Sequence, residues 1–375
     1  MATLCPGEIK ALSGARALPA LLIVLFHYGV FHRYLPAAAL LGPPAMKGYL
    51  WVEFFFALTG FLLIHVYGRR PVFGRAEFRA FLKARLARLY PLHLFTLLTM
   101  LGLMLVLNAL ADAGGYVSLY HGAEAPLNSR PSFLANLFLV QAWNLGEGLS
   151  WNAPAWFVSI EFLLCLSFPV FLFLSRGGVW RGLALIAAGF AWLVLLAWNS
   201  HVGLDITFEN GMFRGLAGFA VGAGMAMVFR AASGWHEAAE WKLSAVQAAL
   251  LLFILWAVYF SGPDHSRADL WCALGFDALI PVLAFDRGFL ARFFALPALA
   301  RLGGWSYAIY MGQMFWLQFA RYLERRALPH GFSQGWLEPL ALLAICILWG
   351  ALLARFVERP ANAFLKRTRR KPDPA

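Results

Sequence analysis

Arg16 and His27 are the first residues whose types and spacing could do chemistry, and they enclose the ten residues ALPALLIVLF. If this stretch is helical, eleven steps give about 16 Å of rise and about 20° of rotation, so both side chains face the same side. A membrane-spanning helix would place the arginine near one surface and the histidine near the middle of the bilayer, where ionisable groups are costly and usually functional. A neutral imidazole can accept a proton from a hydroxyl or be acylated itself. The alternatives are a histidine that only hydrogen-bonds between helices and an arginine that only sets helix orientation.

Arg85 and Arg88 form a second candidate pair, in the segment FLKARLARLYPLH. Their i, i+3 spacing places them on one face of a helix. Two guanidiniums can hold phosphate oxygens bidentately, which lysines cannot do. The alternative is that these arginines only signal topology and contact anionic lipid.

The composition indicates what kind of elements must position these residues. Of the 375 residues, 61% are hydrophobic and 13% are charged, whereas soluble domains are roughly 45 to 50% apolar. The protein is therefore expected to be integral to a membrane. Its net charge of +12 comes from basic residues in short loops, a pattern typical of orientation signals and of contacts with lipid headgroups or anionic cofactors rather than nucleic acid. The four cysteines are scattered and make neither a disulfide framework nor a metal site.

Apolar length predicts an all-α, polytopic membrane bundle of about ten transmembrane helices. The segment 133–145 is apolar but too short to cross unaided, so we expect an interfacial or re-entrant piece. No appended soluble domain is indicated, and we expect one membrane-embedded domain over 1–375 with a basic tail over 357–375. Gly218 and Gly222 are expected to let helices approach closely. The predicted spans are 17–35, 49–67, 89–111, 154–175, 180–199, 211–230, 244–261, 268–285, 302–320 and 336–356.

Basic residues define the predicted orientation of these spans. They gather at 69–88, between the second and third spans, and at 359–371, after the last span. By the positive-inside tendency both regions are cytoplasmic, so an even number of spans leaves both termini in the cytoplasm. The basic loop at 321–326 conflicts with this scheme because it would be external. With this orientation the long stretch 112–153 covers the outer face.

Six segments distributed over nearly the whole chain form one ordered pattern. They are the Arg16 to His27 opening, WVEFFFALTGFLL at 51–63, Arg85 and Arg88 followed by Tyr90 and Pro91, WFVSIEFLLCLSFP at 156–169, LGGWSYAIYMGQ at 302–313, and VERPA at 357–361. In this order they resemble the acyltransferase 3 family of bacterial membrane acyltransferases. Two residues depart from the family pattern: Thr59 replaces a serine, and Gln313 stands where a histidine is often found. His27 is therefore the one well-placed intramembrane histidine that the sequence predicts.

The resemblance implies an enzyme that O-acylates carbohydrate from a cytoplasmic acyl-CoA donor, with acetyl as the default group. Arg16, Arg85 and Arg88 would hold the donor phosphates at the inner face, while the pantetheine arm runs between helices towards His27. His27 would act as general base or would carry the acyl group as an acyl-imidazole. Glu161 would hydrogen-bond the other ring nitrogen and stabilise the imidazolium.

On the acceptor side, the resemblance puts Glu53 in the acidic place of the second segment, where we expect it to steer the acceptor. Trp156, Ser159 and Tyr310 are expected to bind the acceptor as well. The alternative for Glu53 is a solvated acid at the membrane interface.

A transporter or flippase for a glycan or lipid-linked precursor is the alternative function, although the internal repeats typical of transporters are not visible. A sensor that binds acyl groups without turnover is a third alternative. Arg214 is expected to pair with Glu209 or Glu161. The expected location is the bacterial inner membrane, and the expected partners are membrane lipid, acyl-CoA and a carbohydrate acceptor, without nucleic acid, resident cofactor or metal. The sequence leaves open the acceptor, the acyl group and the oligomeric state.

Overall fold

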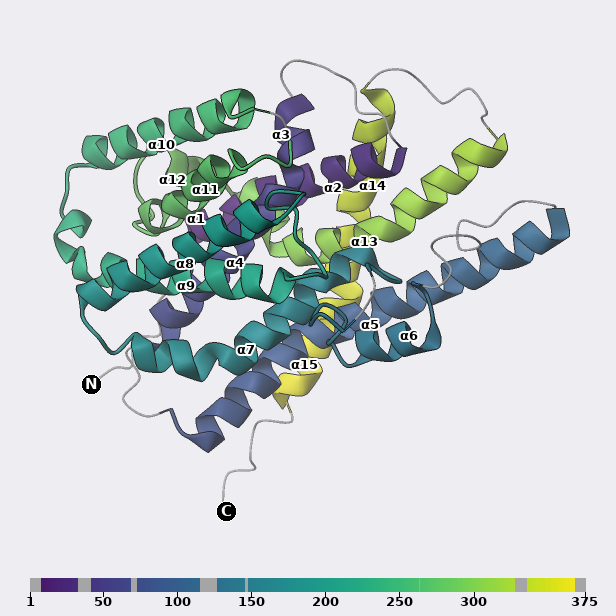
Figure 1. Ribbon diagram of the computed structural model, residues 1–375, viewed down its shortest axis with the longest axis horizontal. Coiled ribbons are helices and arrows are strands. Elements are labelled where there is room, and N and C mark those ends of the chain that lie inside the picture. The colour runs from purple at the N-terminus through teal and green to yellow at the C-terminus, as the bar shows by residue number, and fades with distance from the viewer. Residues whose placement is uncertain are drawn as a thin grey trace. The chain divides into compact units, whose positions relative to one another are not determined.

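The computed structural model describes residues 8–32, 42–68, 73–114, 127–145, 148–262, 264–327 and 336–367. Within these ranges the regular secondary structure is entirely helical (Figure 1), which confirms the predicted all-α class. The helices are α1 (Lys10–Ala15), α2 (Ala17–His32), α3 (Gly42–Met46), α4 (Trp51–Tyr67), α5 (Arg75–Gly114), α6 (Arg130–Leu137), α7 (Trp156–Leu174), α8 (Val179–Asn199), α9 (Gly211–Ala231), α10 (Glu240–Phe260), α11 (Asp269–Leu283), α12 (Phe289–Phe294), α13 (Pro297–Ala327), α14 (Leu337–Leu353) and α15 (Arg359–Arg367). Short helical turns η1 (Lys47–Leu50), η2 (Ala153–Ala155), η3 (Ser233–His236) and η4 (Ala354–Glu358) join some of them.

Each of the ten predicted spans corresponds to a helix. Within the described part of the chain, eight helices are long and apolar enough to cross a membrane. The predicted spans 268–285 and 302–320 correspond to α11, which has 15 residues, and to α13, which has 31. α11 is shorter than the roughly 20 residues that a crossing needs, and α13 is long enough but less apolar. The chain is thus a polytopic helical membrane protein.

The chain divides into two compact units, each assembled from three separate segments. The first unit comprises Met1–Phe73, Ser167–Ile206 and Phe213–Ser306, and the second comprises Gly74–Leu166, Thr207–Met212 and Tyr307–Ala375. The predicted orientation rests in part on residues 69–72 and 368–375, which lie outside the described residues, and it stays a prediction.

Small residues set the packing of the first unit. A Cβ atom at Gly222 of α9 would lie 1.8 Å from the carbonyl oxygen of Ala57 in α4, and one at Gly218 would lie 2.9 Å from the Cβ of Phe56. The close approach of these two helices confirms what the glycine spacing predicted. On another face α4 packs against α11, where the rings of Trp51 and Phe276 stack with centroids 3.7 Å apart.

The second unit contains the longest helix, α5, whose 40 residues span about 60 Å. It begins at Arg75, 14 residues before the predicted edge of the third span at residue 89, so the basic segment before that edge is helical rather than a loop. α15 and the turn η4 pack against α5. The segment 133–145 contains only the end of α6 followed by non-helical turns, in agreement with the prediction that it does not cross.

Candidate active site

Arg16 and His27 lie in the first unit on a nearly continuous helix. Arg16 ends α1 with helical backbone angles, and its carbonyl oxygen accepts a hydrogen bond from Ala20 N at 3.4 Å, so the turn into α2 is retained. The helical geometry predicted from the spacing of Arg16 and His27 is therefore present. The Arg16 Nε donates to Ser13 O at 3.5 Å, and the half-buried ring of His27 lies 5.5 Å from that of Phe26.

Glu53, on the first turn of α4, is fully buried and forms an ion pair with Arg214 of α9. Arg214 also donates to Ile206 O at 2.9 Å and to Tyr49 O at 3.1 Å. One alternative is thereby excluded, because Glu53 is not a solvated interfacial acid. Arg214 pairs with Glu53 where α4 and α9 pack face to face, and its expected pairing with Glu209 or Glu161 stays a prediction.

Arg85 and Glu161 form an ion pair in the second unit, with Nη2 and Oε1 3.0 Å apart. The side chains are 19% and 10% exposed, so solvent screens the pair only partly. The sequence placed Arg85 at the inner surface and Glu161 about 10 Å below the outer start of its span. Their contact places both at one level of the unit, so the two predicted depths are not both right. Arg88 lies one turn further along α5 and is exposed.

Ser159 is fully buried on α7 and fixes the turn that follows α6. Its Oγ donates to Leu139 O at 2.8 Å and accepts from Ala142 N at 3.2 Å. The Trp143 Nε1 donates to Ser159 O at 3.2 Å. Leu139 has a φ of 60°, in the left-handed region that is strained for a branched side chain. The hydroxyl of Ser159 thus holds a strained turn against α7.

Trp156 and Tyr310 are both buried, and both contact Phe157. The Trp156 and Phe157 ring centroids are 6.4 Å apart, and those of Phe157 and Tyr310 are 5.7 Å apart. Gln313, where the family often has histidine, is fully buried and donates from Nε2 to Tyr310 O at 2.9 Å. Trp156, Tyr310 and Gln313 therefore belong to one packed region of the second unit.

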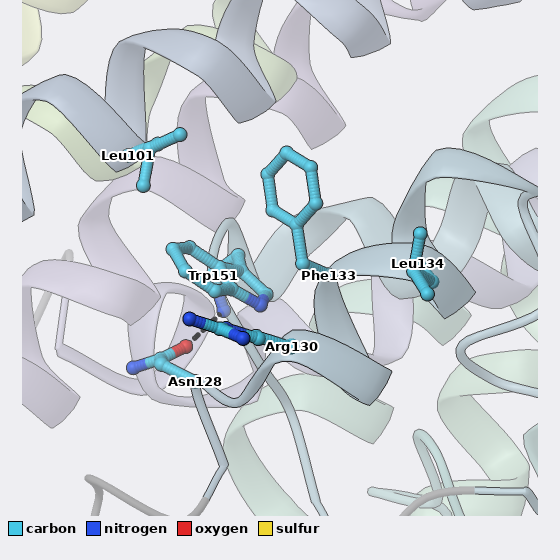
Figure 2. A pocket seen from close by; sticks show the side chains of 6 residues that line it. All are labelled: Leu101, Asn128, Arg130, Phe133, Leu134 and Trp151. Atoms are coloured by element: carbon cyan, nitrogen blue, oxygen red, sulfur yellow. Dashed lines mark hydrogen bonds between the residues drawn. The ribbon is translucent and has the colours of Figure 1, made fainter.

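A pocket of about 430 Å³ lies in the second unit beside α5 and α6 (Figure 2). Trp151, on its wall, has a φ of 54°, which is unusual for a bulky residue. Its backbone N–H donates to Asn128 Oδ1 at 2.5 Å, its Nε1 donates to Ser132 Oγ at 3.0 Å, and its ring meets Phe133 edge to face at 5.1 Å. The indole is thereby held in one position. The lining residues are Leu101, Asn128, Arg130, Phe133, Leu134 and Trp151.

The comparison with known families decides the identity. A family model described as an acyltransferase domain matches residues 9–355. The chain belongs to the acyltransferase 3 family. The resemblance of the six ordered segments is confirmed at family level, and this membrane acyltransferase contains Arg16, His27 and Glu161 within the matched residues.

This acyltransferase is similar in sequence to two curated proteins. It is 28% identical over 354 residues to "Acyltransferase MdmB" of Streptomyces mycarofaciens, a match that covers 88% of this chain and 85% of the relative. It is 39% identical over 105 residues to "Protein 2 in picA locus" of Rhizobium radiobacter, covering 28% of this chain and half of that protein. No solved structure matches it significantly.

Sequence reasoning missed a buried polar cluster in the acyltransferase. Lys47 Nζ lies 2.9 Å from Asp269 Oδ1, and the Tyr49 hydroxyl donates to Asp269 Oδ2 at 2.5 Å. The Tyr49 oxygen in turn accepts from the backbone N–H of His265 at 2.7 Å, and the two rings stack at 4.7 Å. No local signal indicated this cluster, because Lys47 and Tyr49 are separated from His265 and Asp269 by more than 200 residues.

Asp277 of α11 was also missed, although an acid inside a predicted span is a usable signal. Its side chain is 1% exposed, and neither carboxylate oxygen has a hydrogen-bond partner among the described residues. Glu53 acts on it electrostatically. One carboxylate oxygen of Glu53, Oε2, likewise lacks a hydrogen-bond partner among the residues that the structure describes.

Proposed function

We propose that this acyltransferase moves an acyl group, acetyl by default, from cytoplasmic acyl-CoA to a hydroxyl of a cell-surface or exported carbohydrate. The observation that supports it most is the acyltransferase family match over residues 9–355, which includes a half-buried histidine within a helix long and apolar enough to cross the membrane. The proposed location is the bacterial inner membrane. Lipid, acyl-CoA and carbohydrate are the proposed partners, and the protein carries no resident cofactor in this scheme.

The donor phosphates are proposed to bind Arg85 and Arg88 of the second unit, and the predicted contribution of Arg16, in the first unit, stays a prediction. Arg88 is exposed on α5, and Arg85 lies three residues earlier on the same face. Glu161 neutralises Arg85 across 3.0 Å. A phosphate oxygen can replace one carboxylate oxygen at a guanidinium, because both are anionic acceptors with similar bidentate geometry. Donor binding would then release the Glu161 carboxylate for its proposed role.

His27 is proposed as the general base. The acceptor hydroxyl oxygen forms a bond to the thioester carbonyl carbon while a ring nitrogen of His27 takes the hydroxyl proton. The carbon–sulfur bond then breaks, and the imidazolium returns the proton to the CoA thiolate, so that an ester and free CoA result. In the alternative in which His27 carries the acyl group, a ring nitrogen first bonds to the thioester carbonyl carbon while the carbon–sulfur bond breaks and CoA thiolate leaves. The acceptor hydroxyl oxygen then bonds to the same carbon while the carbon–nitrogen bond breaks, and the hydroxyl proton ends on the CoA thiolate. The predicted pairing of His27 with Glu161 joins residues of different units and stays a prediction.

The acceptor is proposed to meet Trp156, Ser159 and Tyr310 in the second unit, and the predicted contribution of Glu53, in the first unit, stays a prediction. Glu53 Oε1 binds Arg214, and Glu53 Oε2 has no hydrogen-bond partner among the described residues, so this oxygen is a suitable acceptor for a sugar hydroxyl. The pocket at Trp151 is also proposed to bind the carbohydrate acceptor, because its fixed indole offers an aromatic face to a sugar ring. Its lining residues other than Leu101 fall within 112–153, the stretch predicted to cover the outer face, where an exported carbohydrate would arrive.

The test is release of free CoA by purified protein in vesicles that contain labelled acetyl-CoA and an envelope glycan fraction. His27→Ala should abolish release, whereas His201→Ala, which changes an exposed loop histidine, should leave it unchanged. Both variants should elute from size exclusion like the wild type. Undiminished CoA release by His27→Ala would exclude the proposed base. Glycan movement across the vesicle without CoA release would instead support a transporter.

A further inference from the structure

The Asp277 carboxyl, on α11 in the first unit, is buried without a hydrogen bond from any described residue. Its side chain is 1% exposed, and both Oδ1 and Oδ2 lack a partner among the residues that the structure describes. Buried carboxylates are normally hydrogen-bonded or paired with a cation, because an isolated negative charge in an apolar interior is very costly. Asp277 has no part in the proposed acyl transfer, so a role for it stands or falls separately from that function.

Glu53 adds to this cost because its carboxylate carries the same sign of charge. It lies on α4, which packs against α11, and it acts on Asp277 electrostatically. Glu53 is itself fully buried, and its Oε2 lacks a hydrogen-bond partner among the described residues. Two carboxylates in one apolar region do not both stay ionised unless enough positive charge joins them.

Arg214 supplies one positive charge and does not balance both carboxylates. Its guanidinium donates to Glu53 Oε1 and to two backbone carbonyl oxygens, while the Asp277 oxygens accept no hydrogen bond from any described residue. Asp205 is a further acid that acts on Arg214 electrostatically. Two carboxylates and one guanidinium leave one negative charge in excess, even before Asp205 is counted. One monovalent cation would neutralise that excess.

The other ionisable groups on elements packed against α11 are placed elsewhere. Lys47 and Tyr49 of η1 bind Asp269, which precedes Asp277 by eight residues, or about 12 Å of helix. Asp277 lies midway along α11, whereas the remaining groups lie near the ends of α1, α8 and α10. Among the described residues, Glu53 is therefore the ionisable group that faces Asp277. The groups near the helix ends are Lys10, Arg181, Glu240, Lys242 and Tyr259.

We infer that Asp277 binds one monovalent cation in the interior of the first unit. A proton and Na⁺ share the required chemistry, which is a single positive charge at a carboxylate oxygen. A proton from the aqueous phase would form an O–H bond with one Asp277 oxygen, whereas Na⁺ would be coordinated without a covalent bond. Either cation removes the repulsion between Asp277 and Glu53 and so favours the packing of α11 against α4.

Infrared difference spectroscopy of the full chain in detergent at neutral pH detects the proton, because a carboxylic acid and a carboxylate absorb at different frequencies. No acyl donor or acceptor is added, so a failure of acyl transfer does not affect the result. The spectrum of the wild type minus that of Asp277→Asn should contain one carboxylic-acid band, which should shift in heavy water. Asp269→Asn is the matched control, because it is the same substitution in the same helix at a carboxylate held by Lys47 and Tyr49. Its difference spectrum should contain a carboxylate band instead.

Thermal unfolding in NaCl and in choline chloride of equal ionic strength detects Na⁺, because a ligand that binds the folded state raises the melting temperature as its concentration rises. If Na⁺ is the cation, the wild type should melt at a higher temperature in NaCl, and Asp277→Asn should melt alike in the two salts. Asp277→Ser is a second variant with the same expected results if Asp277→Asn does not fold.

The two measurements together identify the cation. A carboxylic-acid band that is lost in the Asp277 variant identifies the proton, and a sodium effect that is lost in this variant identifies Na⁺. If the variant loses neither the band nor the sodium effect, Asp277 is ionised without a bound cation and the inference is overturned.

Discussion

Arg214 and Glu53 form an ion pair in which neither side chain is exposed. The two residues lie 161 positions apart and connect α9 with α4. Removing one member of a buried pair leaves an uncompensated charge, at a cost of about 3 to 5 kcal/mol. Each charge of the pair therefore mainly offsets the free-energy cost of burying the other charge.

We expect Glu53→Gln to lower the thermal midpoint of unfolding of the purified protein strongly, because Arg214 would remain charged and buried. The double variant Glu53→Gln/Arg214→Gln should recover part of the loss, since no charge is left unpaired. Fluorescence-monitored melting in one detergent measures both. Glu240→Gln breaks the exposed pair with Arg292 and should change stability by less than about 1 kcal/mol. If the losses in thermal midpoint caused by the two single substitutions simply added in the double variant, the result would contradict coupling between Glu53 and Arg214.

Asp277→Asn should leave the melting temperature unchanged or raise it. Both oxygens of Asp277 lack hydrogen-bond partners among the described residues, so the substitution removes a charge and breaks no hydrogen bond there. Asp269→Asn, in the same helix, is the contrasting variant, because it weakens the contacts with Lys47 and Tyr49 and should lower the melting temperature. A loss of acyl transfer in Asp277→Asn without a loss of stability would show that the carboxyl is kept for function.

Glu161→Gln should strengthen CoA binding while slowing acyl transfer. If Arg85 holds donor phosphate, removing its carboxylate partner frees the guanidinium, and a partly exposed pair is worth about 1 kcal/mol, or about fivefold in affinity. Isothermal titration with CoA measures the first effect, and single-turnover CoA release measures the second. Arg88→Gln should weaken CoA binding in the same assay. Weaker CoA binding by Glu161→Gln would place Arg85 outside the donor site.

Ser159→Ala should loosen the turn at 139–143. The turn would lose the hydrogen bonds of Ser159 Oγ with Leu139 and Ala142, at a cost of about 1 to 3 kcal/mol. The amide of Ala142 should then exchange hydrogen faster, which mass spectrometry of peptides from this turn detects. Ser175→Ala removes a hydroxyl that, among the described residues, donates only to Leu172 O of the preceding helix turn, and should not change the exchange at 139–143. Unchanged exchange in Ser159→Ala would mean that packing alone holds the turn.

The fold was predictable where the signal is local. Apolar runs located the helices, and the spacing of Arg16 and His27 predicted a helical relation that the backbone retains. Gly218 and Gly222 indicated a close helix contact before its partner was known. The six ordered segments also indicated the family, because together they compare many positions of the chain with the family pattern.

The pairing of charges was not predictable, because it depends on which helices meet. Glu53 pairs with Arg214, 161 positions away, and Lys47 pairs with Asp269, 222 positions away. The depths predicted for Arg85 and Glu161 are not both right, for a different reason. Hydropathy marks where a chain becomes polar, whereas α5 continues its backbone hydrogen bonds through the basic segment that begins at Arg75.

Asp205, in the loop between α8 and α9, gives a prediction about pH. Burial raises the pKa of its carboxyl, an effect that the positive charges of Arg214 and His265 oppose and that Asp269 reinforces. Because the folded pKa lies above the unfolded value of about 3.9, the ionised carboxylate costs stability. That cost is absent below the unfolded pKa and develops as pH rises through the raised pKa.

Asp205→Asn should therefore match the wild type in melting temperature near pH 4 and exceed it increasingly towards neutral pH. The 3.7 Å contact with His265 is partly exposed and offsets the gain only while the imidazole is protonated. Melting curves of both proteins across this pH range measure the difference. Glu237→Gln changes an exposed acid outside the contacts of Asp205 and is the control variant. A stabilisation by Asp205→Asn that is largest at the acidic end would reverse the expected sign and show that the folded state favours the carboxylate.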